Sequence, residues 1–332
     1  MRIVTYNVEW FNNLFDDDGM LIDDGGWSGR WDVTRAQQIE ALGGVFTAMD
    51  ADAIMIIEAP DSSRKRDGAL ALTTFAEYFG LRTRAVITGF RNDTQQEIAF
   101  LYDPDVMSAV HDPHGDATFP QFDGKFRMDV DADATPETIR WSKPPLEVAV
   151  TTPHRKVRLI GVHAKSKAPH GTRNLAAATR IAIENRRKQL AQCVWLRGRV
   201  EQHLKAGDDL IVLGDFNDGP GLDEYEKLFG RSGAEIVLGE GNGMQLYDPH
   251  ARMVLGRRVG AQPSTARFKR TGEPFLQALL DYIMVSPGLR AKNPAWQIWH
   301  PFDHPKCYAN QDLREALLLA SDHFPVVLDI AL

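Results

Sequence analysis

The chain has 332 residues, of which 43% are hydrophobic and 25% are charged, and its formal net charge is −7. This composition is typical of a folded globular protein and excludes disorder as the overall state. The negative net charge argues against a protein that holds nucleic acid by bulk positive charge. A local basic patch would still be enough to attract phosphates.

The chain has two cysteines, Cys193 and Cys307, and they lie far apart in the sequence. This pattern excludes a disulfide framework and a cysteine-based zinc site. No segment approaches about 18 consecutive apolar residues, so we expect no membrane span. The first residues enter an apolar run without a basic and apolar leader, so we expect a cytoplasmic protein. No feature of the sequence indicates an oligomeric state.

Short apolar runs, most of them rich in β-branched residues, predict buried strands along the whole chain. They cover residues 3–8, 53–57, 98–102, 146–150, 157–162, 210–213, 279–285 and 324–330. Two segments, 16–29 and 111–136, are predicted to be surface loops.

Helical periodicity predicts a helix over residues 33–49, with Asp32 as its N-cap, and a long helix over about 172–204. The long helix has an apolar stripe formed by Leu190, Cys193, Leu196, Val200 and Leu204. We expect its basic residues to lie on a solvated face; these are Arg180, Arg186, Arg187, Lys188, Arg197 and Arg199.

The order of these elements indicates the fold class. Strands outnumber helices, and several strands follow one another without a helical crossover. Such an order favours mixed or antiparallel sheets with helices outside, an α+β layered sandwich rather than a doubly wound fold. No internal repeat or linker-like segment is evident, so we expect residues 1–332 to form a single domain.

Polar residues interrupt or end most of the predicted strands. They are Asn7 and Glu9 in the first, Glu58 after the second, His163, then Asp215 and Asn217, Asp281, and Asp322 with His323 before the last. A carboxylate at the end of a buried strand is costly unless it is paired or bound to a cation. Because so many strands share this habit, we expect their ends to converge on one polar site. Its oxygen-rich, cysteine-free composition suits Mg²⁺ or Mn²⁺ better than zinc.

Six motifs carry a resemblance to a known family. They are Tyr6-Asn7-Val8-Glu9, Glu58 after an apolar strand, His163-Ala164-Lys165-Ser166-Lys167, Gly214-Asp215-Phe216-Asn217-Asp218, Leu280-Asp281-Tyr282-Ile283 and Ser321-Asp322-His323-Phe324-Pro325-Val326. In these motifs the chain resembles the endonuclease/exonuclease/phosphatase superfamily, which includes DNase I-like nucleases, AP endonucleases, sphingomyelinases and inositol polyphosphate 5-phosphatases. The motifs occur in the family's order and cover nearly the whole chain.

The resemblance implies a four-layered α/β sandwich, with two mixed β-sheets face to face and helices outside. It also implies hydrolysis of a phosphoester that depends on a divalent metal, Mg²⁺ or Mn²⁺, with in-line attack of water. Glu58 resembles the main metal ligand, and Asn7 would lie beside the metal as a ligand or as a partner of one. Asp322 is similar to a further carboxylate on the metal side. Glu9 corresponds either to a second metal contact or to a solvent-facing acid.

The same resemblance implies catalytic roles. Asp215 would orient or deprotonate the attacking water, and Asn217 would hold the phosphate. His163 resembles the histidine that donates to a phosphate oxygen. His323 resembles the final histidine of the family, paired with Asp281, and acts either as general base or as a transition-state stabiliser.

Basic and aromatic residues outside these motifs are candidates for binding the substrate. Lys165 and Lys167 follow His163, and Arg267, Lys269 and Arg270 precede the predicted strand 279–285. Each of these five side chains could either contact a phosphate of the substrate or be an ordinary solvated surface charge. Aromatic residues flank the first loop, namely Trp10, Phe11, Trp27 and Trp31, where core anchoring is the commoner role and base stacking the rarer one.

The sequence therefore predicts a metal-dependent phosphodiesterase of the nuclease type, with nucleic acid as its substrate. The alternative is a phosphatase or phospholipase-type enzyme that acts on a small or lipid phosphoester. A catalytically inactive binding module ranks lowest, because Glu58, Asp215 and His323 are all present.

Overall fold

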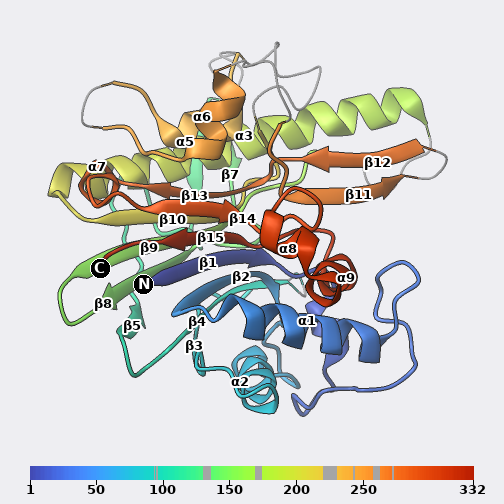
Figure 1. Cartoon of the computed structure of the whole chain (residues 1–332). Helices are drawn as coiled ribbons and strands as arrows, with labels where there is room; N and C mark the ends of the chain where they lie inside the picture. Colours follow the sequence, from blue (N-terminus) through green and yellow to red (C-terminus); the bar gives the residue numbers. More distant parts are fainter. Residues whose placement is uncertain are drawn as a thin grey trace.

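A computed structural model of the chain describes residues 1–92, 94, 96–129, 136–168, 174–219, 230–241, 244–256, 262–270 and 273–332. Two β-sheets pack face to face, and helices cover the outer face of each (Figure 1). The first sheet has six strands in the order β14-β15-β1-β2-β4-β3, and the second has five in the order β13-β10-β9-β8-β5. This is the expected four-layered α+β sandwich.

Both sheets are mixed, because β1 runs parallel to β2 and β9 runs parallel to β10 while the other pairs are antiparallel. The six-stranded sheet consists of β1 (Arg2–Asn7), β2 (Ala53–Ala59), β3 (Ala85–Thr88), β4 (Glu97–Tyr102), β14 (Ala295–Ile298) and β15 (Val326–Asp329). The five-stranded sheet consists of β5 (Ser108–His111), β8 (Leu146–Thr151), β9 (Lys156–His163), β10 (Leu210–Asp215) and β13 (Asp281–Val285). Two hairpins stand apart, β6 (Phe126–Met128) with β7 (Glu137–Ile139) and β11 (Ala266–Arg270) with β12 (Glu273–Ala278).

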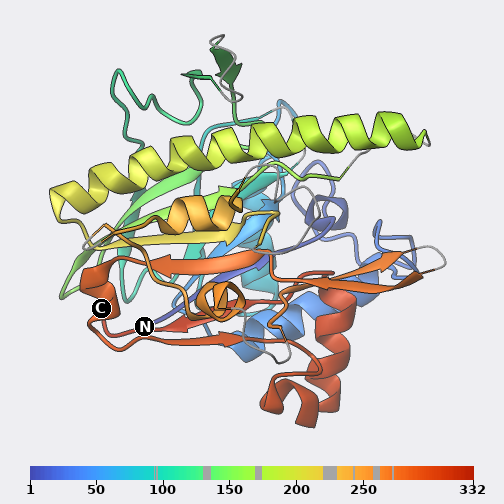
Figure 2. The same cartoon turned by 90° about the horizontal axis from the view of Figure 1, so that it is seen from above.

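Helices on each side bury the outer face of one sheet. The six-stranded sheet is covered by α1 (Arg35–Met49), α2 (Gly68–Tyr78) and α9 (Gln311–Ala320). The five-stranded sheet is covered by α3 (Leu175–Ala206), α5 (Gly233–Leu238) and α6 (Pro249–Leu255). Figure 2 shows α3 extended along this side of the molecule. Short helical turns, η1 (Phe11–Leu14), α7 (Pro287–Arg290) and α8 (Pro305–Ala309), complete the chain. No helix in the described ranges is long and apolar enough to cross a bilayer.

All eight predicted strands are present, as β1, β2, β4, β8, β9, β10, β13 and β15. The strands that the apolar pattern missed are short or lie at sheet edges and in hairpins, where fewer side chains are buried. Helix α1 begins after Thr34, whose side chain and that of Gln37 form a reciprocal capping box, so the prediction of Asp32 as its N-cap was wrong. Both cysteines are buried and free.

The long helix differs from its prediction on its basic face. The apolar stripe packs into the core as expected. Arg186 and Arg199, however, are each only 1% exposed, so the expectation of a solvated face was wrong for them. Arg186 pairs with Asp218 at 2.6 Å, and Arg199 lies 3.2 Å from the Glu147 carboxylate. Burial of these charges is compensated by acids contributed from strand β8 and from the segment after β10.

Candidate active site

The strand-end residues converge in one cavity of about 840 Å³. Eleven residues singled out from the sequence line it, namely Asn7, Glu9, Trp10, Glu58, His163, Lys165, Lys167, Asp215, Asn217, Asp322 and His323. Asp281 lies behind His323 rather than on the cavity wall. The convergence follows from strand register, since Asp215 on β10 pairs with His163 on β9 and with Asp281 on β13.

A hydrogen bond across the sheet interface joins the two halves of the site. Asn7 Nδ2, at the end of β1, donates to Asp215 Oδ2, at the end of β10, at 3.0 Å. Ser321 fixes the neighbouring backbone, because its hydroxyl donates to the Asn7 carbonyl and accepts from the backbone N–H groups of Glu9 and His323. Residues near the two ends of the chain, Asn7 and Ser321, are thus held in fixed positions relative to Asp215 of the second sheet.

Glu58 sits at an irregularity in strand β2. The pairing with β4 shifts between Ile57 and Ala59, and Glu58 has a left-handed φ of 63°. Such a bulge turns one side chain out of the alternation of the strand, and the left-handed conformation of a non-glycine residue is costly enough to need local support. Gln96 supplies part of that support by donating to Glu58 Oε2 at 2.5 Å. Burial raises the pKa of the Glu58 carboxyl, although Lys143 and His323 partly offset this.

Asp215 is the most heavily hydrogen-bonded acid of the site. Its Oδ1 accepts from the backbone N–H of Asn217 at 2.7 Å, and its Oδ2 accepts from Asn217 Nδ2 and from Asn7 Nδ2, both at 3.0 Å. Asn217 Nδ2 also donates to the Ala164 carbonyl, which engages both of its hydrogens. Burial, with the nearby charge of Asp281, raises the pKa of Asp215 to about 7.

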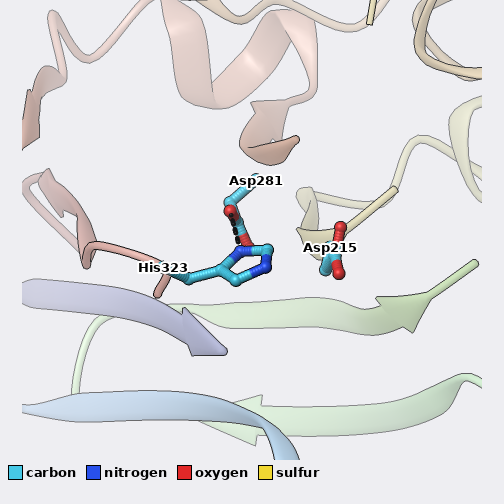
Figure 3. A group of neighbouring side chains, drawn as sticks. All are labelled: Asp215, Asp281 and His323. Carbon is cyan, nitrogen blue, oxygen red and sulfur yellow. Dashed lines mark hydrogen bonds and ion pairs between the residues drawn. The ribbon is translucent and has the colours of Figure 1, made fainter. Parts of the chain in front are cut away.

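Asp281 and His323 form a buried pair, with His323 Nδ1 2.7 Å from Asp281 Oδ2 (Figure 3). The Thr265 hydroxyl accepts from the backbone N–H groups of Leu280 and Asp281 and so fixes this end of β13. Burial by itself lowers the pKa of His323. The charge and hydrogen bond of Asp281, together with Asp215 and Asp322, outweigh it and raise this pKa well above its ordinary value.

Asp215, Asp281 and His323 also offer one ligand atom each within 4.8 Å of one another (Figure 3). This spacing alone would allow a metal ion. His323 Nδ1 is, however, already engaged by Asp281 Oδ2 at 2.7 Å, so these two atoms satisfy each other without an ion. The three residues therefore form an acid–base group more readily than a ligand set.

Lys143 is a residue of the site that the sequence interpretation missed. Its Nζ lies 3.2 Å from His163 Nδ1 and donates to Gln96 Oε1. Burial, with the adjacent Lys143 ammonium, lowers the pKa of His163 well below its usual range and keeps the ring neutral. A visible signal was the pair Pro144-Pro145, which directly follows Lys143 and fixes an extended entry into β8.

Glu9 is tied to the first loop instead of facing solvent freely. Its carboxylate forms an ion pair with Arg30 and accepts from Trp10 Nε1 at 3.0 Å. Burial, with the charge of Asp322, raises the pKa of Glu9 to about 7. The Glu9 side chain is 28% exposed and lines the cavity, so it can reach both a cation bound there and solvent.

The candidate substrate-binding cations fall into two groups. Lys165 and Lys167 line the cavity, and Lys167 Nζ donates to Asp218 at 2.6 Å. Arg267 stacks on Phe275 at 3.5 Å, and Lys269 lies 4.4 Å from the Trp31 ring; neither belongs to the lining of the cavity. The Arg270 side chain lies outside the described residues.

Comparison with known proteins agrees with this geometry. Residues 4–323 match the Endonuclease/Exonuclease/phosphatase family. The chain belongs to this family. Its acids and histidines occupy one cavity, and the protein is an enzyme of the phosphoesterase and nuclease type. No curated protein sequence matches the chain.

Solved structures share the fold over nearly the full chain. Truncated TDP2 from Caenorhabditis elegans superposes with a TM-score of 0.53 at 13% identity, covering 99% of this chain and 97% of that one. The 3′ phosphatase NExo from Neisseria, solved bound to a product DNA hairpin, gives a TM-score of 0.52 at 15% identity, with 100% of both chains covered. At these identities the likeness establishes the fold.

Proposed function

We propose that this protein is a divalent-metal-dependent phosphodiesterase of the nuclease type. The observation that carries the proposal is the meeting, in one cavity, of buried carboxylates with a neutral imidazole, an ammonium group and a buried Asp–His pair. Phosphodiester cleavage needs this combination, because negative charge builds up on the phosphoryl oxygens while a proton leaves the attacking water.

The donor set around Asn7 fits a divalent cation. Asn7 Oδ1 is buried and accepts no hydrogen bond from any of the described residues, which leaves an acceptor in need of a positive partner. The carboxylates of Glu58 and Asp322 line the same cavity. We assign these three residues as the ligands of Mg²⁺ or Mn²⁺, which prefer oxygen donors. When bound, such an ion supplies charge stabilisation and lowers the pKa of bound water.

Of the remaining residues, one accepts a proton from the attacking water and others contact the phosphate. Asp215, held by Asn7 and Asn217, orients the water and accepts its proton. Lys143 Nζ lies 3.2 Å from His163 Nδ1 and 3.4 Å from Nε2. We assign the ring proton to Nε2, which lies 3.7 Å from Asp215 Oδ2 and 3.8 Å from Glu58 Oε1. This N–H and Lys143 donate to the phosphoryl oxygens. Asn217 can join them only if one of its present hydrogen bonds is exchanged.

His323 completes the set as a charged donor fixed by Asp281. In this protonated form it stabilises the transition state and supplies a proton to the leaving oxygen. This assignment favours the stabilising role over that of general base.

The proposed substrate is nucleic acid, and the proposed location is the cytoplasm. A small or lipid phosphoester is the competing substrate class. Supercoiled plasmid, an abasic oligonucleotide, RNA, bis-p-nitrophenyl phosphate and inositol phosphates should be compared in Mg²⁺ and in Mn²⁺. We expect hydrolysis of at least one nucleic acid, loss of that activity in EDTA, and its recovery with either ion. Undiminished turnover in metal-free buffer would overturn the mechanism.

Glu58→Gln tests the ligand assignment directly. One charged oxygen ligand becomes neutral, so the metal concentration for half-maximal rate should rise. Glu40→Gln, on the exposed face of α1, is the matched control and should leave that concentration unchanged. An intact Glu58→Gln variant with the metal requirement of the parent would exclude Glu58 as a ligand.

A further inference from the structure

Trp10 is an exposed aromatic residue on the wall of the catalytic cavity. It follows Glu9 directly, lines the cavity and is 43% exposed. The next residue, Phe11, is fully buried and packs edge-on against Phe75 in the core. The two neighbours thus have separate roles, and core anchoring by Phe11 does not require the Trp10 indole.

The Trp10 indole is held in place from behind. Its Nε1 donates to Glu9 Oε1 at 3.0 Å, and its backbone adopts a left-handed φ of 60°. Gly29 lies against the five-membered ring, where a Cβ atom would stand 2.8 Å from Trp10 Cγ. Gly29 has a φ of 108°, which only glycine adopts readily, so both its backbone and its size suit this contact. The ring is therefore fixed before any substrate arrives.

We propose that Trp10 forms a stacking subsite for a nucleobase adjacent to the scissile phosphate. This inference rests on the proposed nuclease function and narrows its substrate to phosphodiesters that carry a base beside the cleaved bond. A fixed indole in the same cavity as the Lys143 and Lys165 side chains matches the composition of a nucleotide, a flat ring joined to an anion. Because the ring is held in advance, little conformational entropy is lost on stacking. Inorganic phosphate and sugar phosphates have no group that uses such a surface.

The test compares cleavage of one oligonucleotide with that of two analogues. In each analogue a tetrahydrofuran unit replaces the nucleoside on one side of the cleaved bond, which removes the base and keeps the phosphate. Wild type should favour the intact oligonucleotide over one of the analogues. Trp10→Leu should raise KM for the intact strand by about 5- to 150-fold, the range for loss of one base–aromatic stack, and should abolish the preference.

Two variants separate stacking from other effects. Trp10→Phe keeps an aromatic ring without the indole N–H and should retain most of the preference for the intact oligonucleotide. Trp27→Leu removes another exposed tryptophan, 68% exposed and outside the cavity lining, and should change nothing. Thermal unfolding of each variant checks that the fold is retained.

The outcomes distinguish this inference from the function on which it rests. If Trp10→Phe behaves like Trp10→Leu, the indole acts through its hydrogen bond to Glu9 and the stacking subsite is wrong. If KM of Trp10→Leu is unchanged while wild type cleaves the strand, only the subsite is wrong. If Trp10→Leu loses only hydrolysis of phosphatidylcholine vesicles, the indole serves a lipid surface. If wild type cleaves no nucleic acid, the proposed function fails and the subsite fails with it.

Discussion

Asp281 and His323 divide the work of one acid–base group, and their separate contributions can be measured. Asp281→Asn is nearly isosteric, so the fold and the metal site should survive. The amide cannot stabilise the imidazolium of His323, so turnover should fall by roughly two to four orders of magnitude. Metal affinity should change little, because Asp281 lies behind the histidine. Steady-state kinetics with a metal titration measure both quantities.

The double variant tests the coupling of the pair. His323→Ala should cause a loss comparable to that of Asp281→Asn, and the two changes together should be little worse than either alone. Fully multiplicative losses would show that the residues act independently, and the assignment of a dyad would have to be abandoned.

Lys143 provides a second prediction at this scale. If its ammonium contacts the phosphate, Lys143→Met should lower kcat/KM by about 10- to 150-fold, the range for one charge-assisted hydrogen bond. Lys143→Arg should retain part of the rate, because the charge stays. Lys125→Met, at an exposed position, serves as the control. If Lys143→Met has the wild-type kcat/KM, Lys143 does not contact the phosphate during the reaction.

These residues show what a sequence can reveal about a site. Asp215 and His323 were predictable because each belongs to a local motif at the end of an apolar strand. Lys143 and Gln96 were not, because each reaches the cavity from a segment whose position depends on the packing of the two sheets. A lone lysine or glutamine carries no local pattern that distinguishes it from a surface residue.

Helix α3 gives the same lesson for elements. Its apolar stripe could be predicted from the spacing of apolar residues alone, because helical periodicity is a local property of the sequence. The burial of Arg186 and Arg199 was not, since their partners Asp218 and Glu147 lie in other parts of the chain. Basic residues on a helix usually face solvent. Only the tertiary structure shows which of them pair with a buried acidic residue.

Strand β4 begins with a buried acid whose ionisation opposes folding. Glu97 is 6% exposed and accepts from Asn92 Nδ2 at 2.7 Å. Burial raises its pKa from 4.5 to about 7. Between these two values the folded chain binds more protons at Glu97 than the unfolded chain does. This residue therefore lowers the free energy of unfolding as the pH rises from about 4.5 to about 7.

Glu97→Gln should remove this dependence. Relative to wild type, the variant should gain stability between about pH 5 and about pH 8, by an amount on the order of 3 kcal/mol. Urea unfolding at a series of pH values measures the difference. Glu40→Gln should give a difference that does not vary with pH in this way, and the same flat result for Glu97→Gln would contradict the prediction.

The two sheets pack closely together near the site. The stability of the protein should therefore be sensitive to an increase in side-chain volume at their interface. A Cβ atom on Gly161 of β9 would lie 2.4 Å from Met55 Sδ of β2. Gly161→Ala should therefore lower the free energy of unfolding by about 1–3 kcal/mol, the range for overpacking. It should also lower kcat, because Met55 precedes Glu58 and Gly161 precedes His163 on the strands that would be forced apart.

A second change provides the control for this prediction. Met55→Val in the Gly161→Ala background should recover stability and kcat together by relieving the crowding. Recovery of stability without any recovery of kcat would show that the separation of the sheets does not govern the site.

The hydrogen bond from Asn7 to Asp215 has a kinetic consequence. Asn7 belongs to β1 in one sheet and Asp215 to β10 in the other, and the two residues are 208 positions apart in the sequence. Contacts between such distant segments form slowly, because a long loop must close first. During refolding, each sheet can regain its ellipticity before the two have docked. Recovery of hydrolysis should therefore lag behind recovery of the far-ultraviolet signal, and a folding intermediate with nearly complete secondary structure would cleave nothing.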